Sequence, residues 1–134
     1  VIARGEVTYE ELNQIHKKME TLLGQEGAYL DGIYYCPHHP KCGFEGEIKE
    51  LKIECECRKP KPGMLLKAAE DFNIELSQSW MIGDGENDIE MLQHVYIGIA
   101  MGNANESVKN VADYTTEDSD KDGIYHALKH FDLI

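Results

Sequence analysis

The chain has 134 residues, of which 42% are hydrophobic, and its formal net charge is −12. We expect residues 1–134 to form one domain, because this length is enough to bury a core. The acidic balance argues against nucleic-acid binding, which requires clustered Lys and Arg. No apolar run is long enough to span a bilayer and no signal peptide opens the sequence, so we expect a cytoplasmic protein without a membrane partner.

The first predicted helix begins after Thr8 and ends near Gly24 or Gly27. Thr8 and Glu11 have the spacing of a capping box, in which each side chain binds the other residue's backbone. Apolar residues then recur at helical spacing, namely Leu12, Ile15, Met19, Leu22 and Leu23. The apolar segment 28–35 follows, and we predict that it forms a strand.

The stretch 36–58 has no sustained hydrophobic period, so we predict a long loop. Loops of this length are uncommon unless they are functional or pinned. Two pairs in it have one residue between their members: Cys36 with His38, and Cys55 with Cys57. Three thiolates and an imidazole suit tetrahedral Zn²⁺ and leave no open position. We therefore predict a structural zinc site, with 36–57 as a zinc-binding insertion.

All four cysteines of the chain lie in this loop, which in a cytosolic chain favours metal binding over disulfides. His39 and Cys42 are rival ligands, although Cys42 has no close partner in the sequence. The alternative to a zinc site is a cluster of reduced cysteines on a mobile loop.

Beyond the loop, helical and strand patterns alternate. The predicted helices are 63–72, 87–93, 105–111 and 123–131, and the predicted strands are 79–83, 95–101 and 113–116. The strands at 79–83 and 95–101 are apolar rather than alternating, which is typical of a parallel sheet covered by helices on both faces. The chain is therefore predicted to have an α/β fold.

Two groups of charged residues, one next to the loop and one after a predicted strand, lie at positions that suit a phosphate site. Ligands of open α/β sheets bind beyond the carboxyl ends of the strands, and Asp84 follows a predicted strand, where a carboxylate can hold Mg²⁺. Asn87 and Asp88 could orient water or the loop. Arg58 and Lys59, next to the loop, suit anion binding. The alternatives are an N-cap turn and solvated cations.

Several segments together resemble a known group of phosphatases. The segments IARG, YYCPHHP, CECRKPKPGML and WMIGD, at 2–5, 34–40, 55–65 and 80–84, closely resemble the D-glycero-D-manno-heptose-1,7-bisphosphate phosphatases. The related histidinol-phosphate phosphatases of the haloacid dehalogenase (HAD) superfamily share much of this pattern. From residue 83 onward the chain instead resembles the Cof-type branch of that superfamily, in GDGENDIEML, AMGNA and ADY at 83–92, 100–104 and 112–114.

The resemblance implies a three-layer Rossmann-like HAD fold without a large cap domain. It also implies magnesium-dependent hydrolysis of a small sugar phosphate, with D-glycero-D-manno-heptose 1,7-bisphosphate as the leading substrate. Apart from the resemblance, we expect a monomer. Lys59 resembles the lysine that steadies the phospho-aspartyl intermediate, and Arg58 and Asn103 look like phosphate contacts. Asp84 is similar to the magnesium ligand, with Asp88 supporting it. The two cysteine and histidine pairs resemble the family's structural zinc set.

The nucleophile of that family is not found in the sequence. It belongs to an Asp-x-Asp-Gly-Thr element on the first strand, and this element does not occur in the chain. Asp31 followed by Gly32 is no substitute, because no second aspartate lies two residues earlier. The first strand is central in the family's sheet, and its loss would leave unpaired backbone groups at about 1 to 3 kcal/mol each. We therefore expect the N-terminal strand to be absent from these residues and the 134 residues alone to be inactive.

Two alternatives remain open at this point. The chain could be a non-catalytic, zinc-stabilised module that binds phosphorylated ligands or a protein. It could also be a Cof-like or histidinol-phosphate phosphatase that has a zinc loop.

Overall fold

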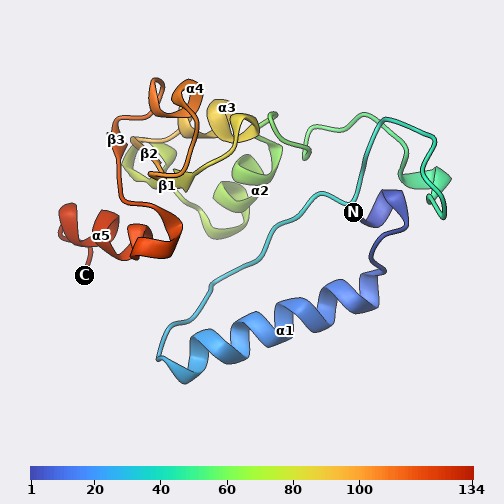
Figure 1. Ribbon diagram of the computed structural model, residues 1–134, viewed down its shortest axis with the longest axis horizontal. Helices are drawn as coiled ribbons and strands as arrows, with labels where there is room; N and C mark the ends of the chain where they lie inside the picture. The colour runs from blue at the N-terminus through green and yellow to red at the C-terminus, as the bar shows by residue number, and fades with distance from the viewer. The chain divides into compact units, whose positions relative to one another are not determined.

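The structure is a computed structural model that describes residues 1–134, and the chain divides into two compact units (Figure 1). Unit 1 is Val1–Arg58 and unit 2 is Lys59–Ile134. The expectation of one domain over the whole chain stays a prediction. None of the helices combines the length and the apolar character that a membrane crossing requires.

Unit 1 contains one long helix, α1, over Tyr9–Gln25, and two short 3₁₀ helices at Ile2–Arg4 and Lys49–Leu51. The predicted capping box is confirmed. The Glu11 backbone N–H donates to Thr8 Oγ1 over 3.1 Å, and the Thr8 N–H donates to Glu11 Oε2 over 2.8 Å. These bonds satisfy two backbone donors that would otherwise lack partners at the helix start.

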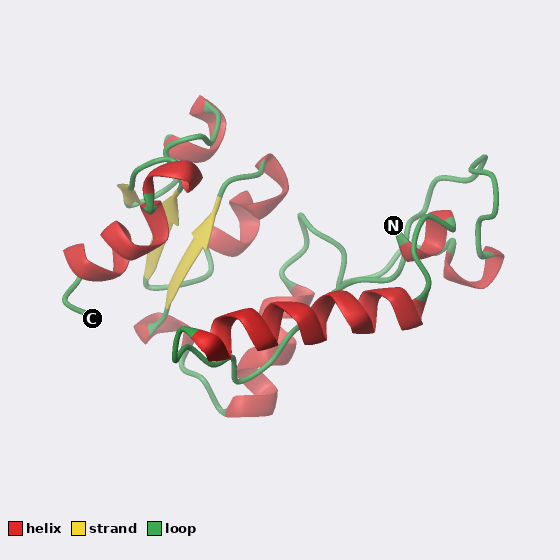
Figure 2. Cartoon of the chain, turned by 60° about the horizontal axis from the view of Figure 1, so that its bottom comes forward, coloured by secondary structure: helices red, strands yellow, loops and turns green.

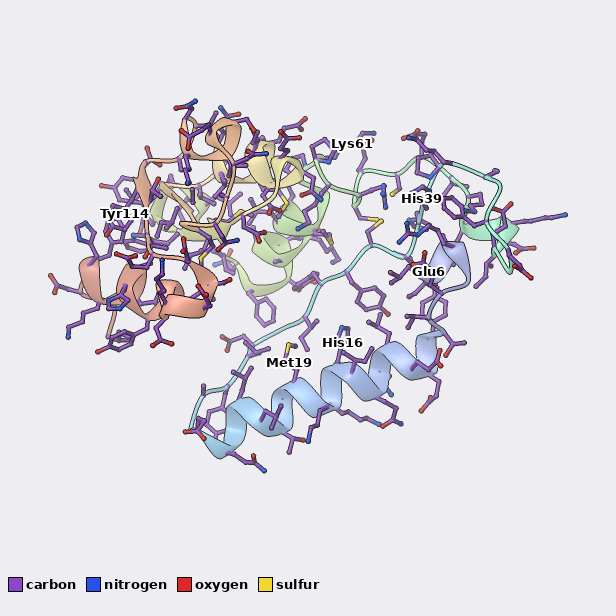
Figure 3. All side chains as sticks on the ribbon, in the orientation of Figure 1. Glu6, His16, Met19, His39, Lys61 and Tyr114 are labelled. Carbon is purple, nitrogen blue, oxygen red and sulfur yellow. The ribbon has the colours of Figure 1, made fainter.

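The strand predicted for residues 28–35 is wrong, because this segment has no ladder partner and no strand assignment. Its apolar residues remain accessible, and Tyr29 is 83% exposed. The Tyr35 ring lies 5.5 Å from the His16 ring of α1, and Figure 3 shows His16 and Met19 projecting from the same side of that helix. A strand needs backbone partners as well as an apolar pattern, so the pattern alone was insufficient here.

The loop of unit 1 is held by a few backbone bonds around Ala3, which is buried together with Ile2. The Ala3 N–H donates to Pro37 O, and the Ile48 N–H donates to Ala3 O, each over 3.1 Å. The Phe44 ring nearby has the Lys52 ammonium 4.5 Å from its centroid. These backbone bonds tie the start of the loop at Pro37 and its middle at Ile48 to the N-terminal residues.

Unit 2 is built on a parallel sheet of three strands in the order β1-β2-β3, shown as yellow arrows in Figure 2. The strands are β1, Trp80–Gly83; β2, Ile97–Ala100; and β3, Tyr114–Thr115. All pairs are parallel, so the predicted α/β fold with a parallel sheet is confirmed. Each strand is shorter than its predicted range, although backbone bonds such as that from Thr116 N–H to Ala100 O continue beyond the strand bounds.

Four helices surround this sheet, and each lies within or next to a predicted range. They are α2, Gly63–Phe72; α3, Ile89–Leu92; α4, Glu106–Lys109; and α5, Gly123–His130. The predicted bounds of α2 are confirmed at both ends. The helix predicted at 87–93 is instead a 3₁₀ turn over Glu86–Asp88 that continues into α3.

The core of unit 2 lies on both faces of β2. On one face, the buried cluster consists of Leu92, Ala100, Ala104 and Val108, with Met81, Ile89 and Ala112 packed against it. On the other face, Ile99 is fully buried, as is Ala127 of α5. This arrangement holds β1 and β2 rigidly, and with them the loops at their carboxyl ends.

The outer edge of β1 has no strand partner. The Gly83 carbonyl accepts from Met101 N–H on the β2 side, so in a parallel pair the backbone groups of Trp80 and Ile82 point to the opposite edge. Trp80 is 39% exposed there. An open edge of this kind is a template for pairing with another strand.

Candidate active site and metal cluster

The loop after β1 is shaped by close contact between Gly83 and Asp88. A Cβ at Gly83 would lie 2.9 Å from Asp88 Cβ, closer than carbon atoms normally approach. Glycine is therefore required here, because only hydrogen fits between the strand and the start of the next helix. The consequence is a tight turn that places the Asp88 carboxylate against the backbone of the loop.

Asp88 is a buried carboxylate with partners on both oxygens. Its Oδ1 lies 2.7 Å from Lys59 Nζ, and its Oδ2 accepts from Gly85 N–H over 3.1 Å and from Asp84 N–H over 3.4 Å. The Asp88 side chain is 6% exposed and that of Lys59 is 36% exposed. A buried carboxylate satisfied in this way fixes both the loop and the position of the ammonium.

Asp84, in contrast, presents its carboxylate at the exposed surface of the loop. Asn103, which follows β2, has its Nδ2 3.5 Å from Asp84 Oδ2, and its Oδ1 accepts from Ser119 N–H over 3.0 Å. The carboxyl ends of the three strands thus meet through Asp84, Asn103 and Ser119. An exposed carboxylate with an oriented neighbour can bind a hard cation such as Mg²⁺.

A second polar network braces the same loop and was missed in the sequence analysis. Glu86 Oε1 accepts from Asn105 Nδ2 over 3.0 Å and from Ser107 Oγ over 3.1 Å. Asn105 also caps α4, since its Oδ1 accepts from Val108 N–H. Asn105 at a predicted helix start was the available signal, but its contact with a residue 19 positions earlier required the fold.

In unit 1 the structure brings Cys36, His38, Cys55 and Cys57 together. Their potential ligand atoms all lie within 4.8 Å of one another. Cys36 Sγ is 3.2 Å from Cys57 Sγ and 3.5 Å from Cys55 Sγ, and His38 Nδ1 is 3.5 Å from Cys57 Sγ. Three sulfurs and one imidazole nitrogen at these separations could hold a single tetrahedral metal ion.

The thiols of this cluster differ in acidity. Burial raises the pKa of the Cys57 thiol to about 12, and thiol hydrogen bonds with Cys36 and Cys55 add to the rise. Burial also acts to raise the pKa of Cys55, but hydrogen bonds from Cys57 and Cys36 bring it below its ordinary value. A cation bound by the cluster would replace the thiol protons, because cysteine binds metals as the thiolate.

Three other predicted residues of unit 1 lie around the cluster. Arg58 is partly buried, and its Nη1 donates to the His38 carbonyl over 3.0 Å. His39, a rival ligand, has its Nδ1 3.2 Å from both the nitrogen and the carbonyl oxygen of Lys41. Cys42, the other rival, is exposed and lies outside the group of four.

The predicted site residues thus fall into two sets. Lys59, Asp84, Asp88 and Asn103 lie together in unit 2, whereas Arg58 belongs to unit 1 with the cysteines. The nearest match in the chain to an Asp-x-Asp-Gly element is 120–123, which lies in a 3₁₀ turn and the first residue of α5 rather than at the end of a strand. It is therefore not placed as a nucleophile.

Relatives of known sequence match most of the chain. The D-glycero-β-D-manno-heptose-1,7-bisphosphate 7-phosphatase of Yersinia pestis is 43% identical over 97 residues, which are 72% of this chain and 50% of that protein. The chain thus spans about half the length of the curated relatives that it matches. These relatives are named as phosphatases of a heptose bisphosphate.

Solved structures give a consistent picture. The D,D-heptose 1,7-bisphosphate phosphatase from B. bronchiseptica, solved with magnesium and phosphate, has a TM-score of 0.72 and 28% identity, covering 97% of this chain and 69% of that one. A HAD subclass IIB sugar phosphatase has a TM-score of 0.53 and 47% identity, and the match covers 55% of this chain and 28% of that one. The sequence model of the haloacid dehalogenase-like hydrolase family matches residues 60–128, which are about half of the chain. The chain belongs to the haloacid dehalogenase-like hydrolase family.

Proposed function

We propose that this chain carries the phosphate-binding and metal-binding part of a magnesium-dependent phosphatase of small sugar phosphates. The leading substrate is D-glycero-D-manno-heptose 1,7-bisphosphate, the compound in the names of the relatives above. The protein would act in the cytoplasm, as a monomer. The reaction would pass through a phospho-aspartyl intermediate whose aspartate is not among these 134 residues.

The observation that carries this proposal is the contact of Lys59 with Asp88 beneath the exposed Asp84, at the carboxyl end of β1. The ammonium is held 2.7 Å from a buried carboxylate and stays 36% exposed. It can therefore contact an anionic group without losing its position. Fixed charges aimed at a transferring phosphoryl group are the main contribution that a protein makes to such reactions.

The acidic loop fits a magnesium ion. Asp84 would hold the ion, and Asp88 would support it by fixing the turn through Gly85 and the Asp84 backbone. When bound, Mg²⁺ shares oxygen ligands with the substrate phosphate and neutralises developing charge. Asn103 orients the Asp84 carboxylate and lies where it can also contact the phosphate.

Arg58 would contact the substrate phosphate, as the resemblance to the phosphatases implies. Its guanidinium is tied to the His38 carbonyl, which belongs to one of the four residues of the cysteine cluster. Structural zinc bound by these four would fix the loop 36–57, and with it the Arg58 side chain. A stiff guanidinium binds phosphate better than a freely rotating one, because less entropy is lost on binding.

The outer edge of β1 suits the strand that would carry the nucleophile. Trp80 and Ile82 direct backbone groups to that edge. A parallel strand paired there would end beside Asp84. Its aspartate could then attack phosphorus, and a second aspartate two residues later could protonate the leaving group.

The test is phosphate release by a protein in which a strand-and-helix segment bearing Asp-x-Asp-Gly-Thr precedes Val1. We expect magnesium-dependent release from heptose 1,7-bisphosphate. Lys59→Met and Asp84→Asn should each lower kcat by roughly 100-fold or more, as loss of a charge-stabilising group does. Lys67→Met is the matched control, because Lys67 is an exposed lysine of α2 that pairs with Asp71. Full activity of Lys59→Met in a folded protein would contradict the proposal.

A second candidate is a Cof-like sugar phosphatase, which the 47% identity to the subclass IIB sugar phosphatase favours. A panel of hexose monophosphates, histidinol phosphate and heptose 1,7-bisphosphate separates the two. We expect the highest kcat/KM for the bisphosphate. Preference for a hexose monophosphate would favour the second candidate and leave the roles of Lys59 and Asp84 unchanged.

A further inference from the structure

Unit 2 has a polar cavity of about 340 Å³, formed by residues of β3, the residues that follow it, and α5. The side chains that line it include Tyr114, Glu117, His126, Lys129 and His130. The proposed phosphatase function uses none of these residues. The question is which ligand such a set of groups would take.

His126 and His130 are four residues apart on α5, so they lie on one face of the helix, and both are exposed. Two imidazoles at this spacing can bind one ion together, which is the physical basis of helical His-x-x-x-His zinc sites. We propose that His126 and His130 form a second site for a divalent transition metal, for which Zn²⁺ is the probe, separate from the cysteine cluster.

The surroundings of His130 favour metal binding. Its ring stacks on Tyr114 of β3 at 4.2 Å between centroids and 10° between planes, and it meets the Phe131 ring edge at 4.8 Å (Tyr114 is labelled in Figure 3). Stacking restrains the orientation of the ring plane. It covers a face of the ring, so a metal ion can still approach the ring nitrogens within the plane. A restrained ligand loses less conformational entropy when it binds an ion.

The charges around the cavity favour a cation over an anion. Glu117 contributes a carboxylate to the lining. The Lys129 ammonium, the one cation of fixed charge in the lining, lies 3.5 Å from the Tyr125 hydroxyl and 5.6 Å from that ring's centroid. Tyr125 does not line the cavity, so the partner of the Lys129 ammonium lies outside it. The net charge of −12 adds a general attraction for cations.

The proposal is tested by calorimetric titration of the 134-residue protein after one equivalent of zinc has been bound and verified. We expect a second equivalent of Zn²⁺ to bind with lower affinity than the first. His126→Gln and His130→Gln should each weaken this second binding by about tenfold or more. His94→Gln, at the end of α3 and outside the cavity, is the matched control and should leave it unchanged.

Nuclear magnetic resonance of the unsubstituted protein gives an independent result that does not depend on the folding of variants. The second equivalent of zinc should shift the ring nitrogen signals of His126 and His130 and leave those of His16 and His94 in place. Absence of a second equivalent would overturn the proposal. So would a second equivalent that neither substitution weakens and that leaves the His126 and His130 signals unmoved.

Discussion

The two units of the chain are held together by different interactions. Unit 2 has a buried apolar cluster around β2, with Ala100 and Val108 completely buried. In unit 1 the buried apolar residues are Ile2 and Ala3, and no residue of the 17-residue helix α1 is buried. Unit 1 has instead the group of three cysteines and one histidine. Burial can therefore stabilise unit 2, whereas we expect unit 1 to depend on a metal ion bound by the cluster.

This difference has a consequence for the proposed chemistry. Lys59 and Asp84 lie on the packed unit and keep their geometry through backbone and ion-pair contacts. Arg58 lies on the weakly packed unit and is positioned through the His38 carbonyl. A change in metal content should therefore affect Arg58 far more than Lys59.

The largest effect is expected from loss of a cluster ligand. Cys57→Ser removes one of the four ligands of the proposed zinc site, and structural zinc sites have binding free energies on the order of 10 to 16 kcal/mol. We expect zinc affinity to fall roughly 1,000-fold, about 4 kcal/mol, as measured by competition with a chelator. Cys42→Ser is the control and should bind zinc as before, because Cys42 is exposed and outside the cluster. Equal loss in both variants would contradict the assignment of ligands.

Removal of a core side chain should act on unit 2. Ile99→Ala deletes apolar atoms from a fully buried position of β2, and we expect the free energy of unfolding to fall by about 3 kcal/mol. Fluorescence of Trp80, the one tryptophan of the chain, reports this unfolding because it lies on β1. Ile15→Ala, at an exposed position of α1, should leave the free energy of this unfolding transition unchanged.

A smaller effect is expected at Asp88. Asp88→Ala leaves the Lys59 ammonium and the Gly85 and Asp84 backbone donors without their acceptor. We expect the free energy of unfolding to fall by about 2 kcal/mol, again followed by Trp80 fluorescence in urea. Glu90→Ala, at an exposed acidic residue two positions further along the chain, should change the free energy of unfolding little. An unchanged Asp88→Ala protein would mean that the ion pair is not formed.

The smallest expected effect is a pH dependence at the start of α1. Hydrogen bonds from the Thr8 backbone and hydroxyl hold the pKa of Glu11 below its usual value. The folded pKa is lower than the unfolded one, so the stabilisation is present above the unfolded pKa and is lost as pH falls through the folded pKa. The protection factor of the Glu11 amide, which is the intrinsic exchange rate at each pH divided by the observed rate, should therefore fall on acidification. In Glu11→Gln, which keeps the capping contacts but does not titrate, it should vary less with pH.

Local signals predicted local structure well and failed where a distant partner decides. The bounds of α2 followed from its apolar face, and the capping box followed from Thr8 and Glu11, because these features depend on neighbours in sequence. The segment 28–35 has a strand-like pattern but no partner for its backbone. In the candidate site, the role of Asp84 could be predicted because Asp84 directly follows a predicted strand. The contact of Glu86 with Asn105 could not be predicted, since it joins loops after different strands.

The most direct test of this contrast is hydrogen exchange measured across the whole protein before and after zinc is removed with a chelator. We predict that removal increases exchange in 36–57 by a large factor and leaves the amides of β1 and β2 protected. Unchanged protection in 36–57 would show that unit 1 is stabilised without metal. Loss of protection in both units together would show that the core of unit 2 is not independent of the cluster. Either result would contradict the account.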